Sequence, residues 1–305
     1  MGGQVSRIII LATHGSRLDR AVSLVLQSAA APLGRAGVLV SASGATCADV
    51  LAAVGGHPCA THVVLVDALD FADDVAGLDG TRAQLVERGS TLELHGLVLP
   101  IFEQALDIWS ESIAEGAAVR DFTSWLADES RIAWPRLLRG AEMTGGGLWP
   151  VHPSACPIEW LVRLLDAPPV LASGIRAIAE EVLPSLPRRL AGWELELCRL
   201  LNVEGRPAAG RVLRLMSPTG PPYRATEEDI AVLLSRFASL VDTLNGGQLR
   251  GGGRAQLASL EMLADVGRIR PPAHEHSVTP PTLHELDKGD RMTRAVLALL
   301  IVGGN

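Results

Sequence analysis

The sequence is poor in cysteine and contains no long apolar run. Its four cysteines include no Cys-x-x-Cys pair, which argues against a zinc ribbon or a disulfide framework, and we expect them to be reduced, buried side chains. No apolar run approaches the ~20 residues of a membrane span. The first apolar run, residues 8–12, is too short for the core of a secretory signal. We therefore expect a soluble, cytoplasmic protein with no membrane partner.

A basic excess is missing as well. The chain carries 34 acidic and 27 basic side chains, and residues 1–118 account for 13 acidic and only 6 basic ones. Binding a phosphate backbone requires a basic face, so nucleic acid is not an expected partner. An acidic surface can attract divalent cations, but a simple solubilising role is the favoured reading.

Residues 1–118 show strand and helix patterns in alternation. The chain has 305 residues, 48% of them apolar, which is enough for a sizeable core and favours two domains. Alternating elements predict right-handed crossovers and a parallel sheet, so we expect an α/β fold in this half. The expected strands are residues 8–12, 37–41, 62–66 and 91–99, and the expected helices after the first strand are residues 18–26, 47–54, 81–88 and 103–114.

Residues 119–305 have a different composition, and we expect a mainly α-helical second domain there. Five of the six tryptophans fall between residues 125 and 193, where they form core or a domain interface or, as a sharper alternative, an aromatic wall for a flat ligand. Residues 145–147 and 149–157 are expected to be a linker or loop, and the glycine-rich residues 245–253 a mobile loop. The expected helices are residues 158–165, 173–183, 193–201, 227–244 and 291–302.

Polar residues follow the predicted strands at the edge where an open α/β sheet places its ligand crevice. The first strand ends at an imidazole, and Ser16 or Asp19 can cap the helix that follows. Carboxylates follow the third and fourth strands, and a Ser-Gly turn follows the second. The residues expected at this edge are Thr13, His14, Gly15, Ser16, Arg17, Ser43, Asp67, Asp70 and Glu103.

Residues 12–17 read Ala-Thr-His-Gly-Ser-Arg directly after a buried strand. This segment resembles the opening of the small class II chelatases, the sirohydrochlorin cobalt and iron chelatases of the CbiX and SirB type, and the likeness extends more faintly to about residue 116. The resemblance implies a chelatase-like, flavodoxin-like parallel sheet and a tetrapyrrole substrate. It also implies that His14 binds metal and accepts protons, and that the protein forms a homodimer.

The chain departs from the family pattern after the third strand. The family usually carries a second metal-binding histidine there, whereas residues 67–75 contain none. Asp67 and Asp70 lie where a carboxylate could replace it, although carboxylates suit hard cations and imidazole suits cobalt, nickel or iron. Either the set of metal ligands has changed or metal insertion has been lost.

Metal insertion needs a neutral imidazole near the path of the metal and a carboxylate that orients it or receives the two pyrrole protons. We expect His14 to supply the imidazole. Glu103, Asp67 or Asp70 can supply the carboxylate, with Glu103 as the expected catalytic partner and the two aspartates as metal ligands.

The carboxylates of such a substrate need cationic or amide donors. Arg17 and the polar groups around Ser16 and Ser43 are the expected substrate-binding residues. Few such donors are present in the first half, so the arginine-rich second half is expected to supply others.

A second group of ligand-type residues lies near the C-terminus. Three histidines and two glutamates fall within twelve residues that prolines flank: His274, Glu275, His276, His284 and Glu285. A solvated polar loop is the simpler reading, because His-x-His alone is a weak signal. If the missing histidine is replaced from elsewhere, these three histidines are the expected metal ligands.

The leading functional expectation is ATP-independent insertion of a divalent metal ion, Co²⁺, Fe²⁺ or Ni²⁺, into a sirohydrochlorin-type tetrapyrrole, with no nucleotide. Two alternatives stay open. The chain can be a non-catalytic metal or tetrapyrrole binding protein, or a chelatase fold recruited to other small-molecule biosynthetic chemistry, since fold and function separate easily.

Overall fold

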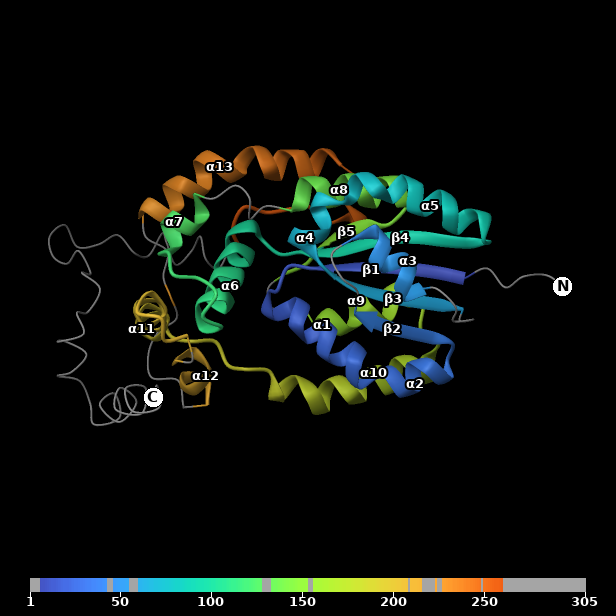
Figure 1. Cartoon of the computed structure of the whole chain (residues 1–305), viewed down its shortest axis with the longest axis horizontal. Helices are drawn as coiled ribbons and strands as arrows, with labels where there is room; N and C mark the ends of the chain where they lie inside the picture. Colours follow the sequence, from blue (N-terminus) through green and yellow to red (C-terminus); the bar gives the residue numbers. More distant parts are fainter. Residues whose placement is uncertain are drawn as a thin grey trace, which may run out of the picture. The chain divides into compact units, whose positions relative to one another are not determined.

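A computed structural model describes residues 6–42, 46–54, 60–127, 133–152, 156–207, 209–215, 223, 227–247 and 249–259. The chain has an α/β fold with a five-strand parallel sheet of the Rossmann or flavodoxin-like kind (Figure 1). This confirms the α/β class and the parallel sheet expected from the sequence. The strands are β1 (Ser6–Thr13), β2 (Val38–Ala42), β3 (Thr61–Asp67), β4 (Ser90–Val98) and β5 (Gly147–Pro150).

The strand order is β2-β3-β1-β4-β5, with β1 at the centre. It differs from the flavodoxin-like order 2-1-3-4-5 because β1 and β3 exchange places. β1 pairs in parallel with β3 on one side and with β4 on the other. Its apolar run explains this position, because Ile8, Ile9 and Ile10 are fully buried and a central strand must be apolar on both faces.

Helices cover both faces of the sheet (Figure 1). One face carries α1 (Arg17–Ser28), α2 (Ala30–Arg35), α9 (Pro157–Leu164) and α10 (Pro169–Val182), and its core joins apolar residues of these helices to alternate residues of the strands, such as Ile9 and Leu11. The other face carries α3 (Cys47–Val54), α4 (Ala68–Asp73), α5 (Leu78–Glu87) and α8 (Trp134–Thr144).

The chain divides into two compact units. Unit 1 consists of Met1–Gln104, Glu129–Leu186 and Leu234–Ser259, and unit 2 of Ala105–Asp128, Pro187–Leu233 and Leu260–Asn305. This division differs from the expected boundary between residues 118 and 119. The reason is that β5, α8, α9 and α10 come from the second half of the sequence and complete the sheet unit.

The prediction of a linker or loop at residues 145–147 and 149–157 is wrong for Gly147, Trp149 and Pro150, because residues 147–150 form β5. The glycines there allow close packing. A Cβ on Gly146 would lie 1.9 Å from the carbonyl oxygen of Leu94, and a Cβ on Gly147 would lie 2.0 Å from Cγ of Arg250. Gly146 is therefore required by the close approach of the β4 backbone at Leu94, and Gly147 by the close approach of the Arg250 side chain.

The described part of unit 2 is helical. It contains α7 (Phe122–Leu126), α11 (Gly192–Val203), α12 (Ala209–Arg214), and the adjoining parts of α6 (Ile101–Ala114) and α13 (Glu227–Gly246). Paired charges are buried inside it. Glu111 pairs with Arg214 at 2.6 Å, and Glu194 accepts two hydrogen bonds from Arg188. The helix expected at residues 291–302 lies outside the described residues.

Residues 245–253 are rich in glycine, and we expect them to be a mobile loop. In the described part of this segment, two residues contact the sheet unit. Leu249 forms a bridge with Leu148 of β5, and Arg250 donates hydrogen bonds to the carbonyl oxygens of Gly145 and Gly146. None of the described helices is both long enough and apolar enough to cross a membrane.

Candidate functional site

The loop after β1 lies at a topological switch point of the sheet. The chain leaves β1 for α1 on one face. The opposite face carries α4, which directly follows β3, and α8, which comes after α6 and α7 in the connection from β4 to β5. In open α/β sheets, ligands bind beyond the carboxyl ends of the strands where successive connections diverge in this way. Because β1 has diverging neighbours on both sides, the residue that directly follows it, His14, is in the position where a ligand is expected.

The backbone of this loop is fixed by a capping box at the start of α1. Ser16 is the N-cap, and its hydroxyl accepts a hydrogen bond from the backbone N–H of Asp19. The Asp19 carboxylate accepts in turn from the backbone N–H of His14 at 2.9 Å and from the hydroxyl of Ser16 at 2.7 Å. The prediction that Ser16 or Asp19 caps this helix is confirmed, since both do. Gly15 has φ 74°, in the left-handed region that favours glycine.

The His14 ring is buried without any hydrogen-bond partner among the described residues. The residue is 4% exposed, and both ring nitrogens, Nδ1 and Nε2, lack partners. The ring stacks on the indole of Trp134, the first residue of α8, with centroids 5.0 Å apart and planes 22° apart. Burial lowers the pKa of His14 from 6.5 to about 3, because desolvation disfavours the charged form. At neutral pH the ring is therefore an uncharged imidazole.

Two other residues predicted for this site, Ser16 and Arg17, lie at the start of α1. Ser16 is 1% exposed and is committed to the helix cap, so its hydroxyl is bonded within the chain. Arg17 is the first residue of α1 and is half-buried. Ser43, the third predicted substrate-binding residue, lies outside the described residues.

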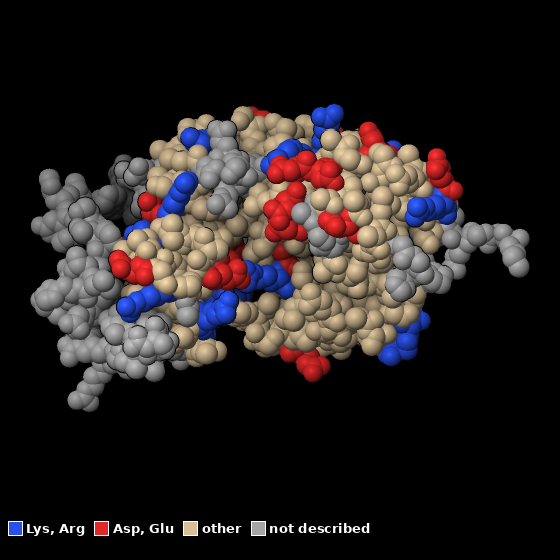
Figure 2. Space-filling model, in the orientation of Figure 1, with Lys and Arg blue, Asp and Glu red and all other residues tan. Residues whose placement is uncertain are grey.

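The aspartates after β3 lie on the surface. Asp67 is the N-cap of α4, and its carboxylate accepts hydrogen bonds from the backbone N–H groups of Leu69 and Asp70. Asp70 is exposed in the first turn of the same helix. Acidic side chains gather over α4 in the space-filling view (Figure 2). Asp73, the last residue of α4, is also exposed and pairs with Arg136.

Glu103 follows β4, the other neighbour of β1, in the first turn of α6. Its Oε1 accepts a hydrogen bond of 2.7 Å from the backbone N–H of Ser259, whereas its Oε2 is buried and lacks a partner among the described residues. The first amides of α6 donate to the chain just before Ser259, from Ile101 to Gln256 and from Phe102 to Leu257. A short segment of the chain therefore covers the start of this helix.

The described residues hold no preformed group of three metal ligands of the His, Cys, Asp or Glu type. The histidines predicted to complete a metal site, His274, His276 and His284, lie outside the described residues. Within the described part, His14 is thus a single buried imidazole at the switch point, with Glu103 at the same edge of the sheet after the adjacent strand.

The contact between Trp134 and His14 was not predicted from the sequence. Trp134 was expected in the core, at an interface or in an aromatic wall, with no assigned neighbour. Residues 133–135 read Ala-Trp-Pro, and a proline in the first turn marks the start of a helix. That signal could have predicted α8, whose first residue lies at the same sheet edge as His14, but not the stacking itself.

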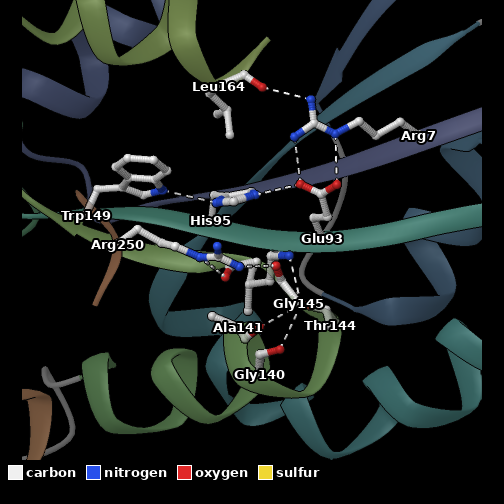
Figure 3. A network of polar contacts seen from close by, with 12 residues as sticks. Arg7, Glu93, His95, Gly140, Ala141, Thr144, Gly145, Trp149, Leu164 and Arg250 are labelled. Atoms are coloured by element: carbon white, nitrogen blue, oxygen red, sulfur yellow. Dashed lines mark hydrogen bonds and ion pairs between the residues drawn. The ribbon is translucent and has the colours of Figure 1, made fainter. Parts of the chain in front are cut away.

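A second polar cluster, on the strands, is fully paired (Figure 3). Arg7 donates two hydrogen bonds to the Glu93 carboxylate, and Nε2 of His95 lies 2.9 Å from Oε2 of Glu93. Nδ1 of His95 accepts from the Trp149 indole at 3.2 Å, so neutral His95 carries its proton on Nε2. Burial raises the pKa of Glu93, but hydrogen bonds from Arg7 and His95 outweigh it and hold the pKa at about 2. Both ring nitrogens of His95 are therefore occupied by contacts within the fold.

His14 and His95 thus form a contrasting pair. Both residues are 4% exposed, but every ring nitrogen of His95 is hydrogen-bonded, whereas neither ring nitrogen of His14 is. A buried polar group without a partner destabilises a fold by about 1–3 kcal/mol, so each such group calls for an explanation, such as a bound ligand, ion or water. Comparison with protein-family models, with characterised proteins and with solved structures gave no match. The assignment of this site therefore depends on its own geometry.

Proposed function

We propose that this chain binds a divalent metal ion at His14 and transfers it, without ATP, into a tetrapyrrole of the sirohydrochlorin type. The observation that carries the proposal is the neutral, unpartnered imidazole of His14 at the switch point of the sheet. A neutral imidazole offers a lone pair that suits Co²⁺, Fe²⁺ or Ni²⁺. The resemblance of residues 12–17 to the class II chelatases supports the same reaction and a chelatase-like identity for the sheet unit.

A single imidazole suits a protein that passes its metal on. Three or four protein ligands would hold the ion as a resident cofactor, whereas a metal substrate must leave for the four ring nitrogens of the tetrapyrrole.

Each residue of the proposed site has a separate role in the reaction. His14 donates its lone pair to the incoming ion while the ion loses water. Two N–H protons leave the ring as the metal enters, and Oε2 of Glu103, which has no partner in the described part of the chain, is the proposed acceptor of one of them; the other passes to solvent. With a pKa of about 3, His14 is a weak base, so its role is ligation more than proton transfer.

A second candidate function is binding of a metal or tetrapyrrole without turnover. The observation that favours it is the burial of His14, a residue that is 4% exposed and stacks on Trp134. A closed site favours retention of a ligand over its rapid release.

The test is metal insertion into sirohydrochlorin, followed by the change in its absorbance on addition of Co²⁺. His14→Phe removes both ring nitrogens but keeps an aromatic ring against Trp134. His152→Ala, at an exposed histidine, is the matched control for loss of one histidine. We expect the wild type and His152→Ala to accelerate insertion and His14→Phe to fall to the uncatalysed rate. Insertion by His14→Phe at the wild-type rate would remove the proposal, and stoichiometric binding without acceleration would establish the second candidate.

A further inference from the structure

Trp134 carries a second unused polar atom beside His14. Its side chain is 2% exposed, and its Nε1–H has no acceptor among the described residues. The indole N–H is a donor only, and a buried tryptophan usually finds a partner for it. Two stacked aromatic side chains at the switch point therefore both keep their polar atoms unpaired.

Trp160 provides an internal comparison. It is also 2% exposed, and its Nε1 also lacks a partner in the described part of the chain. Trp160 belongs to α9 and lies in the apolar core between this helix and the sheet, where its ring packs edge-on against Trp149. An unpaired indole N–H by itself is thus no sign of a ligand. Trp134 differs because its neighbour in the stack, His14, has unpaired nitrogens as well.

The hydrogen-bonding capacity of the stacked pair defines what it can bind. A neutral imidazole has one N–H donor and one lone-pair acceptor, so His14 and Trp134 together offer two donors and one acceptor. The N–H bonds lie in the ring planes, which are only 22° apart, so the donors leave the stack at its edges. A carboxylate has two oxygens and accepts hydrogen bonds only, so it can take both donors.

The start of α8 adds to this preference for an anionic group. Trp134 is the first residue of this eleven-residue helix, and the N-cap position, Ala133, supplies no side-chain hydrogen bond. The N-terminus of a helix carries a partial positive charge that stabilises a nearby anion. The N-terminus of α1 differs, because the Asp19 carboxylate already occupies it.

We propose that the indole N–H of Trp134 and the imidazole N–H of His14 bind one carboxylate group of the ligand, which leaves the lone-pair nitrogen of His14 for the metal. This inference rests on the proposed function in that it takes the switch point to be a ligand site, and it identifies the ligand as a carboxylic acid. Trp134 is then a substrate-binding residue.

The direct measurement is a ¹H–¹⁵N spectrum of the tryptophan indoles during titration with sodium propionate at constant ionic strength. Trp134→Phe and Trp160→Phe assign the two buried indole resonances. We expect the N–H of Trp134 to move downfield and saturate as it donates to the carboxylate, while the N–H of Trp160 stays unchanged. An unmoved Trp134 resonance, or equal shifts of both, would overturn the inference.

The two variants test the affinity independently. Each removes one unpaired, buried N–H but leaves space where the larger indole lay, so the two effects on stability oppose each other and both variants should fold. Trp134→Phe should weaken propionate binding, detected by the remaining indole shifts or by calorimetry, at least tenfold, which corresponds to 1.4 kcal/mol. Trp160→Phe should bind like the wild type, and equal affinity of all three proteins would also refute the role of Trp134.

The outcomes separate this inference from the proposed function. If propionate binds saturably through Trp134 but the protein does not insert metal into sirohydrochlorin, the carboxylate site is supported and the chelatase proposal is refuted. If the protein inserts metal, Trp134 does not respond to propionate, and Trp134→Phe inserts metal at the wild-type rate, the chelatase proposal is supported and the carboxylate site is refuted.

Discussion

Replacing His14 with phenylalanine should stabilise the folded chain. The substitution keeps a flat ring against Trp134 and removes two buried nitrogens that have no partner in the described structure. Each unpaired group destabilises the fold by about 1–3 kcal/mol, whereas fitting the slightly larger ring costs about 1–3 kcal/mol. The two nitrogens together destabilise the fold by about 2–6 kcal/mol, so the midpoints of the two ranges give a net gain of about 2 kcal/mol in the free energy of unfolding.

His95→Phe is the matched control, because His95 is equally buried and both its ring nitrogens are paired. This substitution leaves the Trp149 N–H without its acceptor and takes one hydrogen bond from Glu93. The expected loss is about 2–4 kcal/mol. Urea unfolding followed by circular dichroism measures both changes. If His14→Phe destabilises the chain as much as His95→Phe does, the His14 nitrogens are paired in solution, and the reasoning about the site is wrong.

Three further predictions concern the same unit. Burial holds the pKa of His14 at about 3 in the folded chain against 6.5, so below pH 6.5 the unfolded chain binds a proton that the folded chain does not. The free energy of unfolding should fall as pH drops from 6.5 toward 3, by up to about 1.4 kcal/mol per pH unit. In urea titrations above pH 4.5, the free energy of unfolding of His14→Phe should not show this dependence on pH. Glu93, whose pKa is lowered from 4.5 to about 2 in the folded chain, contributes a loss of stability only below pH 4.5. Asp19→Ala should destabilise the chain by about 1–2 kcal/mol in the same assay, because the capping box of α1 loses its acceptor; an unchanged midpoint would contradict this. Gly146→Ala should destabilise it by more than about 2 kcal/mol, because the new Cβ meets a strand carbonyl at 1.9 Å, while Gly34→Ala, with nothing within 4 Å, should be neutral or stabilising; comparable losses in both would refute the packing argument.

The sequence predicted much of the sheet. Continuous apolar runs identified β1 and β3, and the capping pattern of Ser16 and Asp19 identified the start of α1, because each of these signals is local. β5 was missed because its glycines are also typical of a linker, and only the close approach of Leu94 and Arg250 explains them. Strand order was not predictable either, since a helical crossover can place the next strand on either side of β1.

The site was predicted only in part. The position of His14 after a buried central strand followed from the apolar run and the turn. The stacking on Trp134 did not, because it joins residues far apart in the sequence, and local patterns carry no information about such contacts. The same holds for the contact between Glu103 and Ser259, which depends on where a distant segment returns to the sheet.

The central claim is that the His14 imidazole is a ligand-binding group. Anomalous diffraction at the cobalt edge from crystals of the full chain soaked in Co²⁺ tests it most directly. We predict a cobalt ion within about 2.0–2.2 Å of a His14 ring nitrogen, a bond length typical of imidazole ligands. Cobalt bound only at other histidines, with His14 still stacked and uncoordinated, would contradict the account.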